Sequence, residues 1–247
     1  MAAMIFAGCS SLGTYNPATG KSEFILVSTQ QELAMGQQFH QELLKKYKVA
    51  DSGADVARVK TIGQKIAAIS DRRDYEYRFF VVESDELNAF TTPGGNVYVY
   101  TGLLKKLKND DEIAFVIAHE VGHCAARHVA KKFQAALGYN LIANILLSQV
   151  DPNSQQVVSV GTDTIVKIVF SSYGRQDEFE ADRLGVKYAY LAGYNLQGAL
   201  DALKALEDSS DKTGGPPLLF RTHPYVHDRI GAVETEIKTT PQKYQKL

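Results

Sequence analysis

Hydrophobic positions recur with a helical period in the first quarter of the chain. Thr29 and Glu32 form a capping-box pattern, and the apolar residues that follow to position 44 share one face of a helix. A second amphipathic run covers residues 56–69. Both segments are therefore predicted to be helices.

The next segments have the pattern of strands. Residues 77–82 are rich in β-branched and aromatic side chains, and residues 96–100 alternate behind a Gly94-Gly95 turn. These two segments are predicted to be adjacent strands. Helices around a small sheet define an α+β fold class.

The second half of the chain again favours helices. A long apolar run predicts a helix over 110–132, and Asn195 is placed to cap another helix that ends near position 206. Segments 137–148 and 155–170 are apolar but interrupted by polar residues, and neither reaches the roughly 20 apolar residues of a membrane span. They are interpreted as the two helices of a hairpin. The hairpin could cover a cleft or dock a partner, but the pattern favours packing in the core.

The chemistry-bearing motif of the chain is His119-Glu120-Val121-Gly122-His123, inside the predicted helix 110–132. Positions i and i+4 share a helix face, so both imidazoles reach one metal ion while Glu120 points toward the attacking water. This is the ligand spacing of a zinc peptidase. The alternative is a buried helix with two histidines in the core.

A catalytic zinc usually has a third protein ligand. Glu178 and Asp182 lie four residues apart, next to small and apolar residues that permit close helix packing. A solvated helix face also carries acids at this spacing. The apolar neighbours favour the site over that alternative.

These residues resemble the HExxH and ExxxD signatures of the M48 metallopeptidase family, and the resemblance extends from about position 30 to position 234. It implies a zincin-like fold, one zinc ion per chain and Glu178 as the third ligand. Tyr173-Gly174-Arg175 departs from the Tyr-Ser-Arg that the family often has there. The resemblance also rests on Thr222-His223-Pro224 and on a glycine turn that leads into an edge strand beside the cleft, formed here by Asn96, Val97, Tyr98 and Val99.

The resemblance implies roles for further residues. Glu120 would act as the general base. Asp182 would accept a hydrogen bond from a ligand imidazole, or equally pair with Arg183 on the helix surface. His223 would occupy the open zinc position as a fourth ligand and plug, or equally line the cleft. Helix geometry places His128 about 140° round from His123, so it should not bind the zinc and is expected to make a structural hydrogen bond or line the cleft. The candidates for the oxyanion, with Arg229 also a candidate for the cleft, are His128, His223, Arg229 and a tyrosine.

Composition narrows the partners. The 247 residues carry 27 basic and 28 acidic side chains, a net charge of −1, without the basic stripe that nucleic-acid binding needs. Of the two cysteines, Cys124 is expected to be a small packed thiol. Cys9 follows Ile5-Phe6-Ala7-Gly8, which resembles the end of a bacterial lipoprotein signal, although the segment before it is short and uncharged.

These features together predict a lipoprotein-like tail over 1–28 and a single peptidase domain over 29–247. A lipid on Cys9 would anchor the protein to the periplasmic face of the outer membrane of a Gram-negative bacterium. The alternative to lipidation is a disordered tail with a chance cysteine. The edge strand would bind extended peptides, which favours unfolded or misfolded envelope proteins as substrates and outer-membrane assembly proteins as partners. The alternative functions are a chaperone or assembly factor with a latent protease site and a protein that uses its metal for stability.

Overall fold

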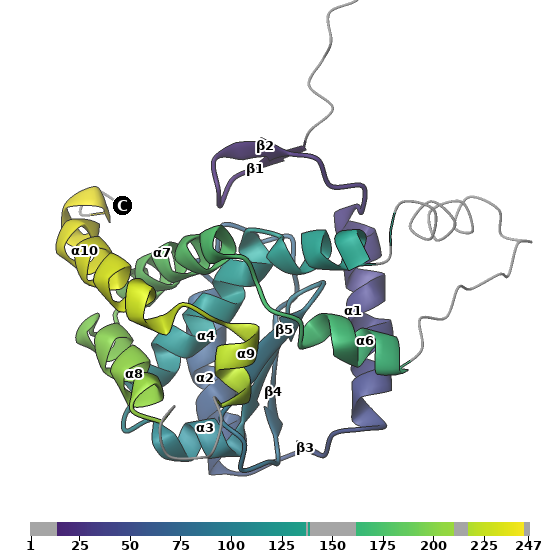
Figure 1. Ribbon diagram of the computed structural model, residues 1–247, viewed down its shortest axis with the longest axis horizontal. Coiled ribbons are helices and arrows are strands. Elements are labelled where there is room, and N and C mark those ends of the chain that lie inside the picture. Colours follow the sequence, from purple (N-terminus) through teal and green to yellow (C-terminus); the bar gives the residue numbers. More distant parts are fainter. Residues whose placement is uncertain (1–13, 137, 139–161, 210–216, 245–247) are drawn as a thin grey trace, which may run out of the picture.

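A four-stranded sheet lies at the centre of the computed structural model, which describes residues 14–136, 138, 162–209 and 217–244 (Figure 1). The strand order is β3-β4-β6-β5. β4 and β6 are parallel, whereas β3 and β5 run antiparallel to their neighbours. The strands are β3 (Val49–Ala50), β4 (Arg78–Val82), β5 (Ala89–Thr92) and β6 (Asn96–Tyr100).

The prediction that residues 96–99 form an edge strand is wrong. β6 has a hydrogen-bonded neighbour on each side, and the edge strands are β3 and, next to β6, β5. Gly94 (φ 79°) and Gly95 (φ 90°) form a turn that folds β5 back along β6, where Thr92 lies opposite Asn96. The predicted adjacency of β4 and β6 is confirmed.

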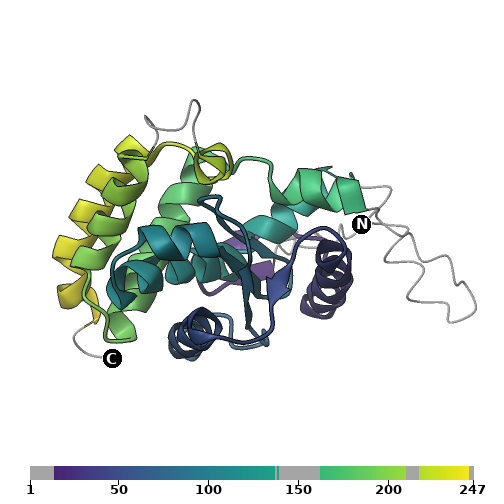
Figure 2. The same ribbon diagram turned by 90° about the horizontal axis from the view of Figure 1, so that it is seen from below.

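Helices surround this sheet. In both views α8 and α10 gather on one side of the molecule, and α1 and α6 lie on the other (Figures 1 and 2). The predicted α+β class is confirmed. The helices are α1 (Thr29–Leu44), α2 (Ala54–Ala67), α3 (Thr101–Lys106), α4 (Asp110–Ala125), α6 (Thr162–Val169), α7 (Arg175–Leu191), α8 (Gln197–Glu207), α9 (Leu218–Thr222) and α10 (Val226–Tyr244).

Helix α4 is the most deeply placed helix. Every residue from Glu112 to Ala125 is buried, because α2, α7, α8 and the sheet all contact it. One core cluster fills the space between these elements, and a second, aromatic cluster lies between α1, α6 and the sheet around Phe39, Phe90 and Tyr98. Residues on α4 are therefore shielded from water on nearly all sides.

Two helix boundaries differ from the predictions. Ser28 caps α1 in a capping box with Gln31, so the cap lies one residue before Thr29. The helix predicted over 110–132 is interrupted, since α4 ends at Ala125 and Arg127 has a left-handed backbone (φ 58°) before the chain becomes helical again at residue 128. The guanidinium of Arg127 donates to Glu32 and to the carbonyl of Val27, and these contacts stabilise the break.

The N-terminal part of the domain contains a β-hairpin within the segment 1–28 that was predicted to be a tail. β1 (Thr14–Asn16) and β2 (Lys21–Glu23) are antiparallel. Ala18, in the turn between them, is buried in the main core, and Lys21 pairs with Glu180 of α7. The boundary placed after residue 28 is therefore not a boundary of the folded part. Cys9 lies outside the described residues.

The segment predicted as a helical hairpin is described only in part. α6 falls within the predicted helix 155–170, and most of the predicted helix 137–148 lies outside the described residues. Within the ranges that the structure covers, no helix combines the length and the apolar character that a membrane crossing requires.

Candidate metal centre

Three residues of the proposed site lie on α4. Asn109 caps the helix by accepting a hydrogen bond from the Glu112 amide, and acidic residues fill the first turn. One helical turn then separates His119 from His123, as the spacing predicts. His119, Glu120 and His123 are all at most 5% exposed.

Helix α7 crosses α4 at unusually short range because both helices have a glycine at the contact. A Cβ atom at Gly122 would lie 2.9 Å from the Ala181 carbonyl oxygen, and one at Gly185 would lie 3.1 Å from the backbone nitrogen of His119. The close approach brings Glu178 of α7 against the two histidines of α4. Any larger side chain at either glycine would push the donor atoms apart.

Four side chains converge at this crossing. Their donor atoms all lie within 4.8 Å of one another, and the fourth side chain is His223, which follows α9. His119 Nε2 is 3.0 Å from His123 Nε2 and 3.3 Å from His223 Nδ1. Glu178 Oε1 is 3.1 Å from His223 Nδ1 and 3.5 Å from His123 Nε2.

The spacing of these atoms fits a zinc ion. Tetrahedral zinc with bonds of about 2.0–2.1 Å places its ligand atoms roughly 3.3 Å apart. The four separations given above, 3.0 to 3.5 Å, bracket this value, and His119 Nε2 lies 3.7 Å from Glu178 Oε2. Burial holds the pKa of His123 well below its ordinary value, with Glu178 partly opposing and His119 adding to the decrease, so this imidazole is neutral as a metal ligand must be.

His119 is oriented by a charged pair. Its Nδ1 lies 2.8 Å from Asp182 Oδ1, and Arg229 donates to both carboxylate oxygens of Asp182 at 2.7 Å. Burial would raise the pKa of Asp182, but Arg229 and His119 outweigh it and keep the pKa below its ordinary value. Asp182 therefore accepts the Nδ1–H of His119 and leaves Nε2 facing the other donors.

Arg229 also contacts the third acid. Its Nη1 lies 2.7 Å from Glu178 Oε2. Burial would raise the pKa of Glu178, and Arg229 and His223 hold it well below the ordinary value instead. The guanidinium thus contacts two carboxylates, Glu178 and Asp182, and supports the metal ligands. It is not free to stabilise an oxyanion.

His123 is oriented by a different group. Its Nδ1 lies 3.1 Å from His128 Nδ1, and His128 Nε2 lies 3.2 Å from Glu180 Oε2. When His123 binds a metal through Nε2, its Nδ1–H donates to His128 Nδ1, and His128 donates its Nε2–H to Glu180. His128 therefore lies on the side of His123 away from the donor cluster, where it makes the structural hydrogen bond that the sequence predicted as one of its roles and is not placed to contact an oxyanion.

Two residues at the site were not identified from the sequence. The ring of Tyr173 stacks on His123 with centroids 3.9 Å apart, and the ammonium of Lys132 lies 3.8 Å from the centre of the Tyr173 ring. Burial lowers the pKa of Lys132 to about 8, with Glu120 and Glu178 partly opposing. The neighbouring Gly174 precedes α7 and donates its amide to Asp177, so this turn forms without a serine.

Glu120 faces the donor cluster without being part of it. Its Oε1 lies 3.4 Å from His223 Nε2, and its Oε2 is buried with no hydrogen-bond partner in the described parts of the chain. A buried carboxylate with a free oxygen is suited to accept a proton from a bound molecule. His223 lies between this carboxylate and the other donors.

Comparison with known proteins identifies relatives of nearly the whole chain. Residues 54–237 match the model of peptidase family M48. The chain is similar to the beta-barrel assembly-enhancing protease of Yersinia pestis, with 28% identity over 87% of this chain and 45% of the relative. It is also similar to the mitochondrial metalloendopeptidase OMA1 of Schizosaccharomyces pombe, with 26% identity over 89% of this chain and 65% of the relative. The chain thus spans less than half of the Yersinia pestis protein and about two thirds of the yeast one.

Proposed function

The chain belongs to peptidase family M48, and on that premise we propose that it is a zinc-dependent endopeptidase with Glu120 as its general base. His119, His123 and Glu178 would hold the ion. When bound, zinc acts as a Lewis acid on the scissile carbonyl and makes water more acidic. Glu120 would accept a proton from the attacking water and pass it to the leaving amine.

One observation carries this proposal: a buried carboxylate with a free oxygen lies directly beside four convergent donors. A zinc ion that only stabilised the fold would need no base at this position. Glu120 on the donor side of α4 therefore favours catalysis over the structural alternative.

We further propose that the site is latent as it stands. His223 Nδ1 lies within the donor set, and His223 Nε2 approaches Glu120. An imidazole there would fill the position that the substrate and the attacking water need. Activity then requires the segment of α9 and His223 to move away.

The position of α9 also supports the proposal that the site is latent. The amide of Leu219 donates to the carbonyl of Leu87, two residues before β5, at 3.2 Å, and Tyr173 donates to the carbonyl of Thr222 at 3.0 Å. The segment therefore runs from the start of the edge strand to the metal centre. An extended peptide would follow the same course along β5.

The natural substrates we propose are unfolded or misfolded envelope proteins. Extended binding to a strand edge selects chains without folded structure. The name of the Yersinia pestis relative refers to β-barrel assembly, which suggests outer-membrane proteins as the substrate class and assembly proteins as partners. A lipid on Cys9 would place the protein at the outer membrane.

Hydrolysis of casein, measured together with zinc content, tests the proposal. We expect about one zinc ion per chain in the wild-type protein. Glu120→Gln should retain the metal and lose hydrolysis by ~100- to ~10,000-fold, because an amide keeps the shape but cannot take the proton. Retained turnover in this variant would contradict the role of Glu120.

The latent state has its own test. His223→Ala should hydrolyse casein faster than the wild-type protein while its zinc content stays near one. A slower variant with normal zinc would instead assign His223 to substrate binding.

A second candidate function is a chaperone or assembly factor that keeps its protease site closed. The insertion of His223 among the donors favours it, since a plugged site still leaves the strand edge and the helical surface for binding. If neither the wild-type protein nor His223→Ala cleaves casein, while the wild-type protein still suppresses aggregation of unfolded outer-membrane proteins, this candidate is the correct one.

A further inference from the structure

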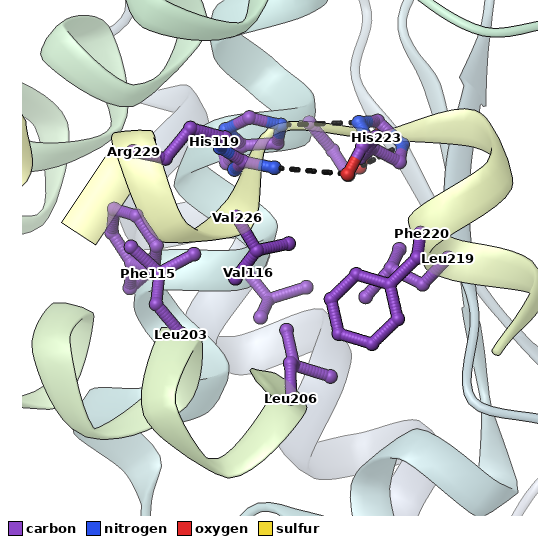
Figure 3. A pocket seen from close by; sticks show the side chains of 11 residues that line it. Phe115, Val116, His119, Leu203, Leu206, Leu219, Phe220, His223, Val226 and Arg229 are labelled. Atoms are coloured by element: carbon purple, nitrogen blue, oxygen red, sulfur yellow. Dashed lines mark hydrogen bonds and ion pairs between the residues drawn. The ribbon is translucent and has the colours of Figure 1, made fainter. Parts of the chain in front are cut away.

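The two histidines of α4 differ in how far away their supports lie. In Figure 3 Arg229 lies next to His119 at the centre itself, with its Nη2 3.4 Å from His119 Nδ1. His123 is supported by His128, and the position of His128 depends on a turn of the chain. Whatever fixes this turn also fixes the orientation of His123.

His128 would not reach His123 if α4 continued as a regular helix. Two residues five positions apart lie about 140° apart around a helix axis. Their Nδ1 atoms are 3.1 Å apart because the helix ends at Ala125 and the chain turns at Arg127. The backbone of Arg127 is therefore a required part of the support of His123.

An arginine at this turn is conformationally unfavourable. Its φ of 58° lies in the left-handed region, which residues with a β-carbon rarely adopt and glycine adopts freely. Helices commonly end with a glycine in this conformation directly after the C-cap. Here Ala126 is the C-cap and Arg127 follows it. Contacts of its side chain must therefore hold the arginine in the turn.

Glu32 of α1 provides the main contact. Its Oε1 accepts hydrogen bonds from Nε of Arg127 at 2.7 Å and from Nη2, and its Oε2 accepts from the hydroxyl of Tyr75. The same guanidinium donates to the carbonyl of Val27. Glu32 is 1% exposed and Arg127 is 7% exposed. Both oxygens of the carboxylate are thus engaged, and the arginine side chain is fixed in one position.

Stability alone does not account for a buried pair of this kind. The desolvation of two charges offsets most of their attraction, so apolar side chains of similar volume are often as stabilising as a buried ion pair. A buried pair can instead specify one conformation among several. The conformation that this pair specifies is the left-handed turn at Arg127, which places His128 behind His123.

We propose that Glu32 is a positioning residue of the metal centre. Through Arg127 it holds the turn that places His128, and His128 orients the imidazole of His123 toward the zinc ion. Glu32 acts on the metal only through these residues. The proposal rests on one part of the proposed function, the assignment of His123 as a zinc ligand. Zinc affinity, which requires no turnover, is therefore the quantity to measure.

Two double variants separate the turn from the ion pair. Glu32→Gln/Arg127→Gly and Glu32→Gln/Arg127→Ala remove the same two charges, so neither leaves one member of the pair without the other. They differ because glycine adopts the left-handed backbone freely and alanine does not. We expect the glycine variant to keep zinc affinity within about 3-fold of the wild-type value and the alanine variant to lose at least about 5-fold. Chelator competition measures the affinity, and circular dichroism verifies that both variants fold.

Glu32→Gln alone tests the carboxylate. It leaves Arg127 without its counterion, and zinc affinity should fall by at least about 5-fold as His128 loses its place. Glycine at position 127 in the same background should then restore most of the affinity. A pair that only stabilised the fold would lower the free energy of unfolding without this recovery. If Glu32→Gln does not fold, the comparison of the two double variants still decides.

The outcomes for the inference and for the proposed function are distinct. Equal zinc affinities in the two folded double variants would overturn the inference, whether both match the wild-type protein or both fall below it. Wild-type affinity in folded Glu32→Gln would also overturn it. If the wild-type protein and His223→Ala bind zinc but do not hydrolyse casein, the proposed peptidase function fails, and the zinc affinities still decide the role of Glu32. A wild-type protein that binds no zinc would overturn both.

Discussion

The two histidines of α4 are oriented by two different arrangements. His119 donates to Asp182, a carboxylate that is 2% exposed and paired with a buried arginine. His123 contacts His128 through their Nδ1 atoms, and the far nitrogen of His128 reaches Glu180. Both arrangements fix the same tautomer, with Nε2 toward the metal.

The difference lies in where the charge is held. On the His119 side the charges lie within hydrogen-bond distance of the ligand, so two carboxylates and Arg229 must all be desolvated together. On the His123 side the imidazole of His128 acts as a spacer. The carboxylate of Glu180 then lies nearer the surface, with 16% of its side chain exposed, and pairs with the exposed Lys21.

The same orienting effect therefore has different consequences for folding on the two sides. A fully buried ion pair is strongly destabilised when one partner is removed, because the other charge is left without a counterion. On the His123 side the acid behind the imidazole of His128 is partly exposed, so replacing it leaves no fully buried charge without a counterion. Substitutions on the two sides are therefore expected to differ in size.

The largest effect is expected for Asp182→Ala. It leaves Arg229 with Glu178 as its one carboxylate partner among the described residues, and the free energy of unfolding should fall by about 3–5 kcal/mol. Zinc affinity should fall by about 10- to 100-fold as His119 loses its acceptor. Denaturant unfolding and a chelator competition measure the two quantities.

Asp182→Asn is the matched control. Its amide oxygen still accepts from His119 but carries no charge for Arg229, so stability should fall more than zinc affinity. If Asp182→Ala unfolds at the same denaturant concentration as the wild-type protein, the buried pair is not what stabilises this side.

The next effect is expected for His128→Ala. His123 loses its acceptor, and zinc affinity should fall by about 10- to 100-fold, while stability falls by only about 1–3 kcal/mol. His128→Gln offers an amide oxygen at a similar distance and should recover part of the affinity. Full zinc affinity in His128→Ala would show that stacking on Tyr173 suffices to orient His123.

The sequence predicts the His119 side of the metal centre better than the His123 side. Helical spacing alone places His119 near His123 and Glu178 near Asp182, because i and i+4 share a face. The role of His128 depends on the left-handed backbone of Arg127. Arginine rarely adopts that backbone, and the contacts that stabilise it come from residues about 100 positions earlier.

Long-range pairing explains the other differences. The alternation of residues 96–100 predicts a strand, but which strand forms the edge depends on where β5 pairs. The hairpin at residues 14–23 has local turn signals in Asn16, Pro17 and Gly20 that could have been used. The contact of this hairpin with α7 could not be predicted, since Lys21 and Glu180 are 159 residues apart in the sequence.

A smaller effect is expected for Glu180→Ala. Glu180 supports His123 only through His128, and Asp177 lies 3.5 Å from His128 Nε2 as an alternative acceptor. Zinc affinity should therefore fall by less than about 10-fold. Glu178→Ala, two residues away, removes a donor and is the reference for loss of the metal. Equal zinc content in the two variants would contradict the assignment of Glu178 as the ligand.

The smallest effect is expected for Lys21→Ala, which probes the outermost contact on the His123 side. The ammonium of Lys21 lies 3.2 Å from Glu180, but 69% of its side chain is exposed. An ion pair in that position contributes less than about 1 kcal/mol, because water and salt screen it. The melting temperature should change little and zinc affinity should not change. A loss of zinc affinity in Lys21→Ala comparable to that in Asp182→Ala would contradict this expectation. It would mean that the N-terminal hairpin controls the orientation of His123, so that the His123 side of the centre depends on surface contacts and the His119 side does not.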